Sequence, residues 1–164
     1  FEAPQRPEDF KLYPHTIESL KKIQSMGYYL FVITNQPDAA KGKTTMKNLW
    51  DVHDKFHEIL ITNGVYFKDY YYCFHHPSVS KCECRKPSPF FFFFSKKEFN
   101  LNLKKSWMIG DRNTDIVCGI NAGTKTIKIT EEKESNLADF AAKNLEETVE
   151  IIKFCDKLRK KVKI

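Results

Sequence analysis

Residues 73–87 read CFHHPSVSKCECRKP, a stretch with a Cys-x-His pair, a six-residue gap and a Cys-x-Cys pair. Thiolate sulfur and imidazole nitrogen are the ligands that zinc prefers, and structural zinc sites use four of them in a tetrahedron. The pattern therefore predicts a zinc loop over residues 73–84. The predicted ligands are Cys73, His75, Cys82 and Cys84. His76 is an alternative to His75, and reduced surface cysteines beside two histidines are the alternative without a metal.

Two cationic residues, Arg85 and Lys86, follow the loop without a spacer. A metal that ties down the loop would hold both cations in place, so we expect them to meet an anionic substrate. The net charge of +6 agrees with an anionic partner such as a phosphorylated metabolite or a nucleic acid. Because basic and aromatic residues do not alternate regularly, we expect no nucleic-acid partner.

The composition is that of a globular protein of one ordinary domain, with 164 residues of which 41% are hydrophobic and 29% charged. No apolar run is long enough to span a bilayer, and the first residues lack a secretory signal, so we expect no membrane partner. The count of five cysteines is odd, which argues against a disulfide framework. These features favour a cytoplasmic protein, and we expect a monomer.

Apolar runs that end in turn residues alternate with stretches of helical periodicity. The strands are predicted at 28–33, 70–72, 106–109 and 126–129, with a last edge strand at 137–142. The helices are predicted at 14–27, 44–63, 88–100, 116–123 and 144–162, and an acidic loop at 130–135. Alternation of this kind is typical of the α/β class. We expect a Rossmann-like, mostly parallel sheet with helices on both faces, in a single domain over residues 1–164 with the zinc loop as a small insertion.

Polar side chains follow two of the predicted strands. Thr34, Asn35 and Gln36 come directly after the strand at 28–33, and ligands of α/β sheets bind at the carboxyl ends of strands. Asp111 follows the strand at 106–109, with Asp115 one helical turn further on. Two carboxylates in this position suit Mg²⁺, while capping of the next helix is the alternative.

Five consecutive phenylalanines, Phe90 to Phe94, lie in the predicted helix at 88–100. Five positions cover more than one helical turn, so some must face away from any single core. We expect a helix that is buried nearly all round, and an exposed aromatic patch that binds a partner is the alternative.

The segments VITNQ, CFHHP…CECRKP and MIGDRNTD, in this order, resemble the haloacid dehalogenase-like phosphatases. The segment RPEDFKLYPHTIESLKKIQSMGYYLFVITNQ is similar to the stretch after the nucleophile loop in that family, so the resemblance covers roughly residues 6–130. The zinc loop narrows it to the subgroup that contains D,D-heptose 1,7-bisphosphate phosphatase and the histidinol-phosphatase domain.

The resemblance implies hydrolysis through an aspartyl-phosphate with Mg²⁺ as cofactor and Zn²⁺ as a structural ion. It implies that Thr34 donates a hydrogen bond to the transferring phosphoryl group and that Lys86 neutralises its charge. Asp111 would help to hold Mg²⁺, and Asp115 would orient the loop. The implied substrate contacts are Asn35, Gln36, Arg85 and Arg112.

The nucleophile motif of this family, Asp-x-Asp, is absent from the 164 residues. Each buried backbone group left unpaired by a lost central strand costs about 1–3 kcal/mol, so a stable domain should retain that strand. We therefore expect the nucleophile strand to lie upstream of residue 1, and a genuine fragment or a relative without catalytic activity is the alternative.

The expected function is hydrolysis of a small phosphorylated sugar, D-glycero-D-manno-heptose 1,7-bisphosphate, in lipopolysaccharide precursor biosynthesis. Histidinol-phosphate phosphatase and a non-catalytic, zinc-stabilised anion-binding module are the alternatives.

Overall fold

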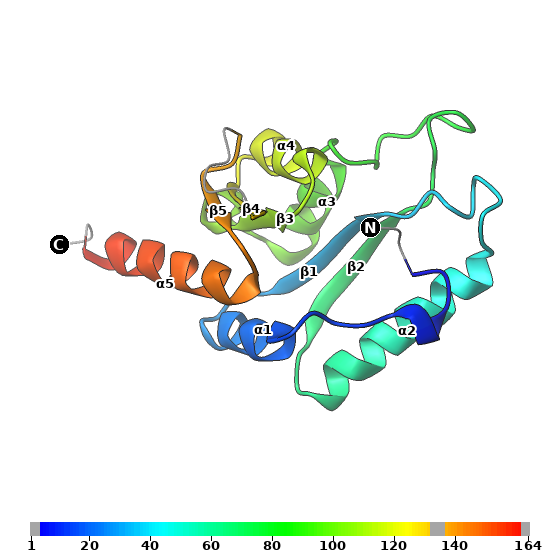
Figure 1. Cartoon of the computed structure of the whole chain (residues 1–164). Helices are drawn as coiled ribbons and strands as arrows, with labels where there is room; N and C mark the ends of the chain where they lie inside the picture. The colour runs from blue at the N-terminus through cyan, green and yellow to red at the C-terminus, as the bar shows by residue number, and fades with distance from the viewer. Residues whose placement is uncertain (1–3, 132–136, 162–164) are drawn as a thin grey trace. The chain divides into compact units, whose positions relative to one another are not determined.

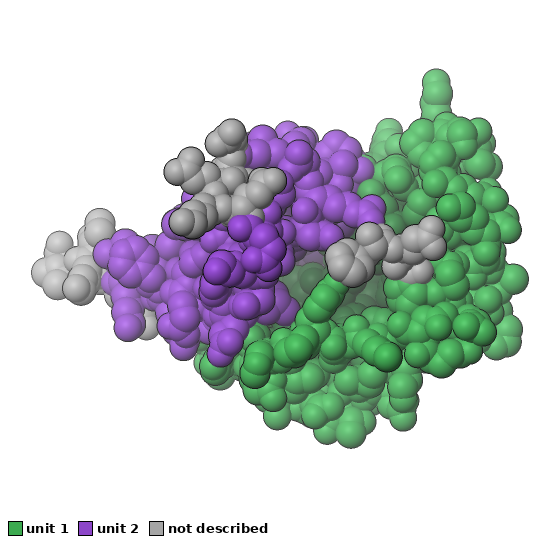
Figure 2. Space-filling model, viewed as in Figure 1, with its two compact units in different colours: residues 1–85 green, residues 86–164 purple. Residues whose placement is uncertain are grey.

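The computed structural model describes residues 4–131 and 137–161, and the chain divides into two compact units (Figure 2). Unit 1 comprises residues 1–85 and unit 2 comprises residues 86–164. The boundary therefore falls between the two cations that follow the Cys/His stretch. Most of the acidic loop predicted at 130–135 lies outside the described residues.

Unit 1 contains a two-stranded parallel sheet, which Figure 1 shows with its strands side by side. Its elements are the 3₁₀ turn η1 (Pro7–Asp9), α1 (Thr16–Ser25), β1 (Leu30–Asn35), α2 (Met46–Thr62) and β2 (Phe67–Cys73). Thr45 caps the start of α2, because its side chain accepts a hydrogen bond from the Asn48 backbone N–H.

Aromatic side chains join α2 to β2 and to the chain before α1. The ring centroid of Phe56 lies 6.0 Å from that of Phe67 and 5.4 Å from that of Phe10. Leu60 is fully buried on the same helix. Trp50, however, is 44% exposed, so the apolar stripe of α2 only partly faces the core of unit 1.

Unit 2 contains a three-stranded parallel sheet in the order β3–β4–β5. Its elements are α3 (Phe90–Phe99), the 3₁₀ turn η2 (Leu103–Lys105), β3 (Trp107–Gly110), α4 (Asn113–Ala122), β4 (Lys125–Ile129), β5 (Phe140–Ala142) and α5 (Leu145–Lys161). Every strand pair in the described residues is parallel, which confirms the α/β class. The described strands form two sheets, whereas the sequence predicted one.

The expectation for the phenylalanine run was wrong. In α3, Phe92 is buried, but Phe93 and Phe94 are each 51% exposed. Successive helical residues point about 100° apart, so the core of unit 2 receives only one side of the run. Among the described residues, no helix combines the length and the apolar character needed to cross a membrane.

Gly119 allows α4 to pack closely on β3 and β4. A Cβ atom at this position would lie 2.5 Å from the Cβ of Met108 and 2.8 Å from the Cγ2 of Thr126. Both distances are shorter than any ordinary carbon–carbon contact, so the helix can approach the sheet only through glycine. The position of the α4 N-terminus therefore depends on this contact.

We predict that Gly119→Ala destabilises the protein by about 1–3 kcal/mol, because the added methyl group overpacks the interface between helix and sheet. Urea unfolding followed by circular dichroism measures the change. The matched control is Ile120→Ala on the exposed side of α4, which should change stability by less than about 0.5 kcal/mol. Equal effects of the two substitutions would contradict the prediction.

Candidate active site and metal centre

The ends of β1 and β2 bring two distant segments of unit 1 together. Thr34 pairs with Tyr72 and Asn35 with Cys73 in the parallel register. The Gln36 backbone N–H then donates a hydrogen bond to the Cys73 carbonyl at 2.8 Å. The Thr-Asn-Gln segment and the start of the predicted zinc loop therefore lie side by side at the carboxyl edge of this sheet, where α/β proteins bind ligands.

Four side chains of the loop converge as the sequence predicted. The ligand atoms of Cys73, His75, Cys82 and Cys84 all lie within 4.8 Å of one another. The Cys73 sulfur is 3.7 Å from the Cys82 sulfur, and His75 Nδ1 is 3.7 Å from the Cys73 sulfur and 3.4 Å from the Cys84 sulfur.

These distances match the edges of a metal-centred tetrahedron. With bonds of about 2.3 Å to sulfur and about 2.05 Å to nitrogen, two sulfurs lie roughly 3.8 Å apart and a sulfur and a nitrogen roughly 3.5 Å apart. The group therefore has the donor set and the spacing to hold a four-coordinate ion.

The pKa values of the three thiols indicate why a cation is needed to hold all three as thiolates. Burial raises the pKa of Cys73, and burial together with the neighbouring thiols raises the pKa of Cys84 to about 12. Burial also acts to raise the pKa of Cys82, but hydrogen bonds from the Arg85 backbone and the nearby thiols outweigh it and lower the value. Three thiolates this close repel one another, so full deprotonation requires a bound cation.

The choice between the two adjacent histidines is settled by geometry. His76 Nδ1 lies 2.6 Å from the Ser78 hydroxyl and accepts the Ser78 backbone N–H at 3.2 Å. His75 Nδ1 is the imidazole nitrogen that faces the sulfurs of Cys73 and Cys84. His75 thus belongs to the cluster, and His76 stabilises the turn that comes after it.

Arg85 is fixed to the loop itself. Its Nη1 donates a hydrogen bond to the His75 carbonyl at 3.0 Å, so the guanidinium folds back over the residue that supplies the imidazole. A planar guanidinium has five N–H donors, which leaves it able to bind an anion while it keeps this contact.

Lys86 has its described partner in unit 2. Its Nζ lies 2.7 Å from Asp115 Oδ1, and the two side chains are only 10% and 7% exposed. The other oxygen of Asp115 accepts the Arg112 backbone N–H at 3.0 Å, which caps α4. Both oxygens of Asp115 are therefore engaged. For this residue the structure favours capping of the following helix, which the sequence analysis gave as the alternative to binding Mg²⁺.

Asp111 and Arg112 are exposed and lie between β3 and α4. Asp111 comes directly after Gly110, the last residue of β3, at the carboxyl edge of the unit 2 sheet. Thr34, Asn35, Gln36 and Arg85 belong to unit 1, whereas Lys86, Asp111, Arg112 and Asp115 belong to unit 2. The structure thus gathers the predicted residues into two groups, one in each unit.

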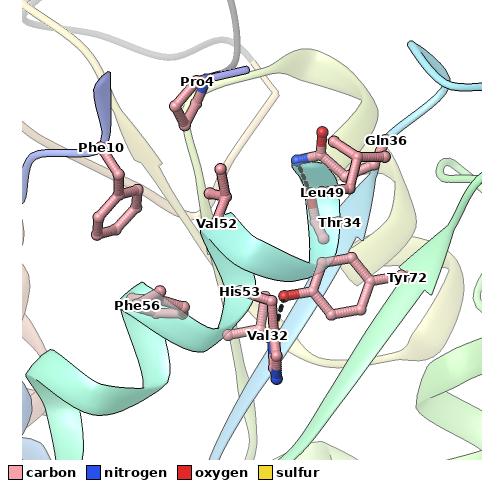
Figure 3. Close-up of a pocket in the computed structure, with 10 residues that line it drawn as sticks. All are labelled: Pro4, Phe10, Val32, Thr34, Gln36, Leu49, Val52, His53, Phe56 and Tyr72. Carbon is pink, nitrogen blue, oxygen red and sulfur yellow. Dashed lines mark hydrogen bonds between the residues drawn. The ribbon is translucent and has the colours of Figure 1, made fainter. Parts of the chain in front are cut away.

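A cavity of about 180 Å³ in unit 1 opens beside Thr34 (Figure 3). Its apolar lining is Pro4, Phe10, Val32, Leu49, Val52 and Phe56, and its polar lining is Thr34, Gln36, His53 and Tyr72. Figure 3 shows Gln36 and Thr34 close together, with the Gln36 amide donating to the Thr34 hydroxyl at 3.1 Å.

Sequence reasoning missed the pairing of His53 with Tyr72 in this cavity. His53 Nδ1 lies 2.8 Å from the Tyr72 hydroxyl. Burial lowers the pKa of His53 and raises the pKa of Tyr72 to about 12, so both side chains are uncharged at neutral pH. The sequence signal that could have revealed this pairing is the position of Tyr72, which lies near the end of a predicted strand and one residue before Cys73.

Comparison with known proteins identifies the family. The HAD-hydrolase-like family model matches residues 83–151. A D-glycero-beta-D-manno-heptose-1,7-bisphosphate 7-phosphatase from Helicobacter pylori is 32% identical over 149 residues, which cover 89% of this chain and 85% of that protein. The chain belongs to the HAD-like phosphatases. The resemblance inferred from the three motifs is thereby confirmed.

A second relative of this HAD-like phosphatase is a D-glycero-alpha-D-manno-heptose-1,7-bisphosphate 7-phosphatase from Photorhabdus laumondii. It is 37% identical over 122 residues, which cover 71% of this chain and 67% of that protein. The fold resembles that of D,D-heptose 1,7-bisphosphate phosphatase from B. bronchiseptica, with a TM-score of 0.79 at 20% identity over 90% of this chain and 87% of that chain. The fold also resembles that of a putative HAD-like phosphatase from Mesorhizobium loti, with a TM-score of 0.78 and 22% identity. The match covers 90% of this chain and 77% of that chain.

We predict that Gly110→Ala displaces Lys86 from its partner. A Cβ atom at Gly110 would lie 2.5 Å from Asp115 Oδ2 and 2.7 Å from its Cγ, so the carboxylate must move and its buried ion pair must weaken. We expect a loss of about 1–3 kcal/mol of stability together with a lower rate of phosphate ester hydrolysis. Urea unfolding and steady-state kinetics measure the two effects.

The control for Gly110→Ala is Gly42→Ala, where a Cβ atom meets nothing within 4 Å. That variant carries only the strain of a positive φ. Unchanged hydrolysis by Gly110→Ala would contradict the role given to the close contact with Asp115.

Proposed function

We propose that this HAD-like phosphatase hydrolyses D-glycero-D-manno-heptose 1,7-bisphosphate and releases one phosphate. The observation that carries the proposal is the pair of anchored cations at residues 85–86, directly after a Cys/His cluster that matches a metal tetrahedron. The substrate is supported by two relatives at 32% and 37% identity that are named as phosphatases of this bisphosphate. Two cations suit a substrate with two phosphate groups.

The proposed roles follow from the chemistry of each side chain. Thr34 donates a hydrogen bond to the transferring phosphoryl group, and Lys86 neutralises the charge that develops on it. The Lys86 ammonium acts in a mostly buried position, where an electrostatic contact is stronger than in water. Arg85 binds the second phosphate, for which its forked donors are suited. The proposed contacts to the rest of the substrate are Asn35, Gln36 and Arg112.

Asp111 is the proposed protein ligand for Mg²⁺ in unit 2. Asp115 is occupied by Lys86 and by the Arg112 backbone, whereas Asp111 is exposed at the end of β3. Mg²⁺ is usually held by one or two carboxylates and keeps several waters, so a single exposed aspartate fits. A solved structure with the same fold contains magnesium and phosphate. When bound, the ion would offset negative charge on the phosphate oxygens.

The nucleophile is proposed to be an aspartate outside the 164 residues, since these contain no Asp-x-Asp. Among the described strands, β1 pairs with β2 only and β3 pairs with β4 only. We also propose that units 1 and 2 belong to one catalytic domain, because the match to the Helicobacter pylori relative covers 89% of the chain.

The Cys/His cluster is proposed to hold one zinc ion. Three sulfurs and one nitrogen form a typical structural zinc set, and four ligands complete the coordination of such an ion. The thiols must remain reduced to bind the ion, which favours the cytoplasm as the compartment.

We predict that the complete protein hydrolyses the heptose bisphosphate and that Lys86 is essential. Lys86→Ala alone would leave the Asp115 charge buried without its partner, at a cost of about 3–5 kcal/mol. The sharper variant is Lys86→Met with Asp115→Asn, which removes both charges and keeps an amide oxygen to cap α4. We expect kcat to fall by roughly 10²–10³-fold with the fold intact, as measured by phosphate release.

The control for this experiment is Lys97→Ala, an exposed lysine of α3 that should leave kcat unchanged. Undiminished turnover in the double variant would refute the role of Lys86. Faster hydrolysis of histidinol phosphate than of the heptose bisphosphate would refute the substrate.

We predict that one zinc ion binds per chain and that its loss affects substrate binding more than chemistry. The loop anchors Arg85, whereas Lys86 is held by Asp115 of α4, so removal of zinc should raise KM more than it lowers kcat. Elemental analysis of the purified protein and kinetics of Cys84→Ser measure these effects. A folded protein without zinc, or a Cys84→Ser variant whose kcat falls while KM stays constant, would contradict the prediction.

A further inference from the structure

The backbone after Lys86 is held by two side chains of α4. The Cys118 sulfur donates a hydrogen bond to the Ser88 carbonyl at 3.0 Å. The Asn121 Nδ2 donates a hydrogen bond to the Pro87 carbonyl at 3.2 Å. Neither residue belongs to the three motifs of the sequence.

These two contacts lie on the same face of α4 as the ion pair to Lys86. Asp115, Cys118 and Asn121 follow one another at intervals of three residues, which places them in a row along one side of a helix. Each of the three side chains contacts a different residue of the segment 86–88, through an ion pair or a hydrogen bond. One helix face therefore fixes the ammonium of Lys86 and the two carbonyl groups that come next in the chain.

We propose that Cys118 and Asn121 are positioning residues, which hold the backbone after Lys86 so that its ammonium stays where it meets the phosphoryl group. The proposal rests on the proposed function for the role of Lys86, but the contacts themselves do not. It assigns a task to two side chains that have no part in binding metal or substrate.

The physical reason lies in the length of the lysine side chain. A four-carbon stem has many rotamers, so an ion pair at Nζ alone allows the backbone to shift while the pair is kept. Two hydrogen bonds to the backbone remove that freedom, and the ion pair then sets the direction of the stem. A displacement of about 1 Å at a reacting group can cost on the order of 100-fold in rate.

The state of Cys118 suits this role. The side chain is 1% exposed, and burial, reinforced by the charge of Asp115 and opposed by that of Lys86, raises its pKa to about 11. The sulfur therefore keeps its proton at neutral pH and can donate it to the Ser88 carbonyl. A thiolate would have no proton to give and would repel the carbonyl oxygen.

The first test measures the exposure of Lys86 and needs no turnover. The complete protein is treated with a trace of acetic anhydride, and the acetylation of Lys86 relative to exposed Lys97 is measured by peptide mass spectrometry. We expect the Cys118→Ala/Asn121→Ala variant to label at Lys86 at least about threefold faster than wild type, because the loop can then move the ammonium away from Asp115. Unchanged labelling overturns the proposal.

Two variants separate positioning from a general loss of packing. Cys155→Ala removes another buried cysteine of unit 2, on α5, and should leave Lys86 labelling as in wild type. The single variants Cys118→Ala and Cys118→Ser are compared as well. Cys118→Ser keeps a hydrogen-bond donor at the same place, so its Lys86 should label at a rate closer to that of wild type than the Lys86 of Cys118→Ala. If Cys155→Ala accelerates labelling as much as Cys118→Ala does, the effect is structural and the proposal fails.

The second test is a double-mutant cycle in hydrolysis of the heptose bisphosphate. Cys118→Ala/Asn121→Ala should lower kcat by roughly 3–30-fold and leave KM within about twofold, since the loss lies in the placement of a reacting group. The same two substitutions should have no further effect in the Lys86→Met/Asp115→Asn protein. An equal loss in that background overturns the proposal. If the wild-type protein hydrolyses no phosphate ester, the proposed function fails and the labelling result decides the positioning role.

Discussion

The ion pair between Lys86 and Asp115 is the interaction on which the candidate active site depends. Its atoms are 2.7 Å apart and both side chains are at least nine-tenths shielded from solvent. Taking two charges out of water costs several kcal/mol for each ion, so such a pair is weak evidence for stability and better evidence for a constraint on position. The pair places an ammonium close to the N-terminus of α4, and the same carboxylate caps that helix.

The close packing of α4 on its sheet is what makes this placement possible. Gly119 lets the helix approach β3 and β4, and Gly110 leaves room for the Asp115 carboxylate at the end of β3. Two positions without a side chain therefore determine where a charged group can lie. In the sequence, Gly110 is noticed only because it precedes Asp111 in the motif MIGDRNTD. The structure shows that a glycine is needed at this position because a Cβ atom there would clash with the side chain of Asp115.

Much of the fold and the metal cluster could be predicted from the sequence, because both depend on local patterns. The period of apolar residues located the strands and helices, and the spacing of Cys73, His75, Cys82 and Cys84 predicted four side chains that converge in the structure. The His75–His76 doublet could not be resolved from sequence, since adjacent imidazoles have the same chemistry and only the Ser78 contact separates them. The phenylalanine run was misjudged because composition does not say how much of a helix the core can cover. The contacts of Cys118 and Asn121 were missed because each bonds to a backbone carbonyl some thirty residues away, which no side-chain pattern records.

The loop and the helix hold two adjacent cations by different means. From sequence, one metal was expected to steady both Arg85 and Lys86. In the structure, Arg85 bonds to the His75 carbonyl of the loop, while the anchors described for Lys86 and the backbone after it all come from α4. Of residues 73–84 only Cys73 is buried, and Phe74 packs against the rings of Tyr72 and Trp50. The rest of the loop has little apolar packing of its own, so an ion would have to supply its rigidity. Structural zinc binds with an apparent free energy on the order of 10 kcal/mol, which is ample for that task. The support of the two cations thus changes from the Cys/His loop to α4 at a single peptide bond. Under the proposed roles, this arrangement would let the contacts of the loop to substrate vary while the Lys86 ammonium stays fixed.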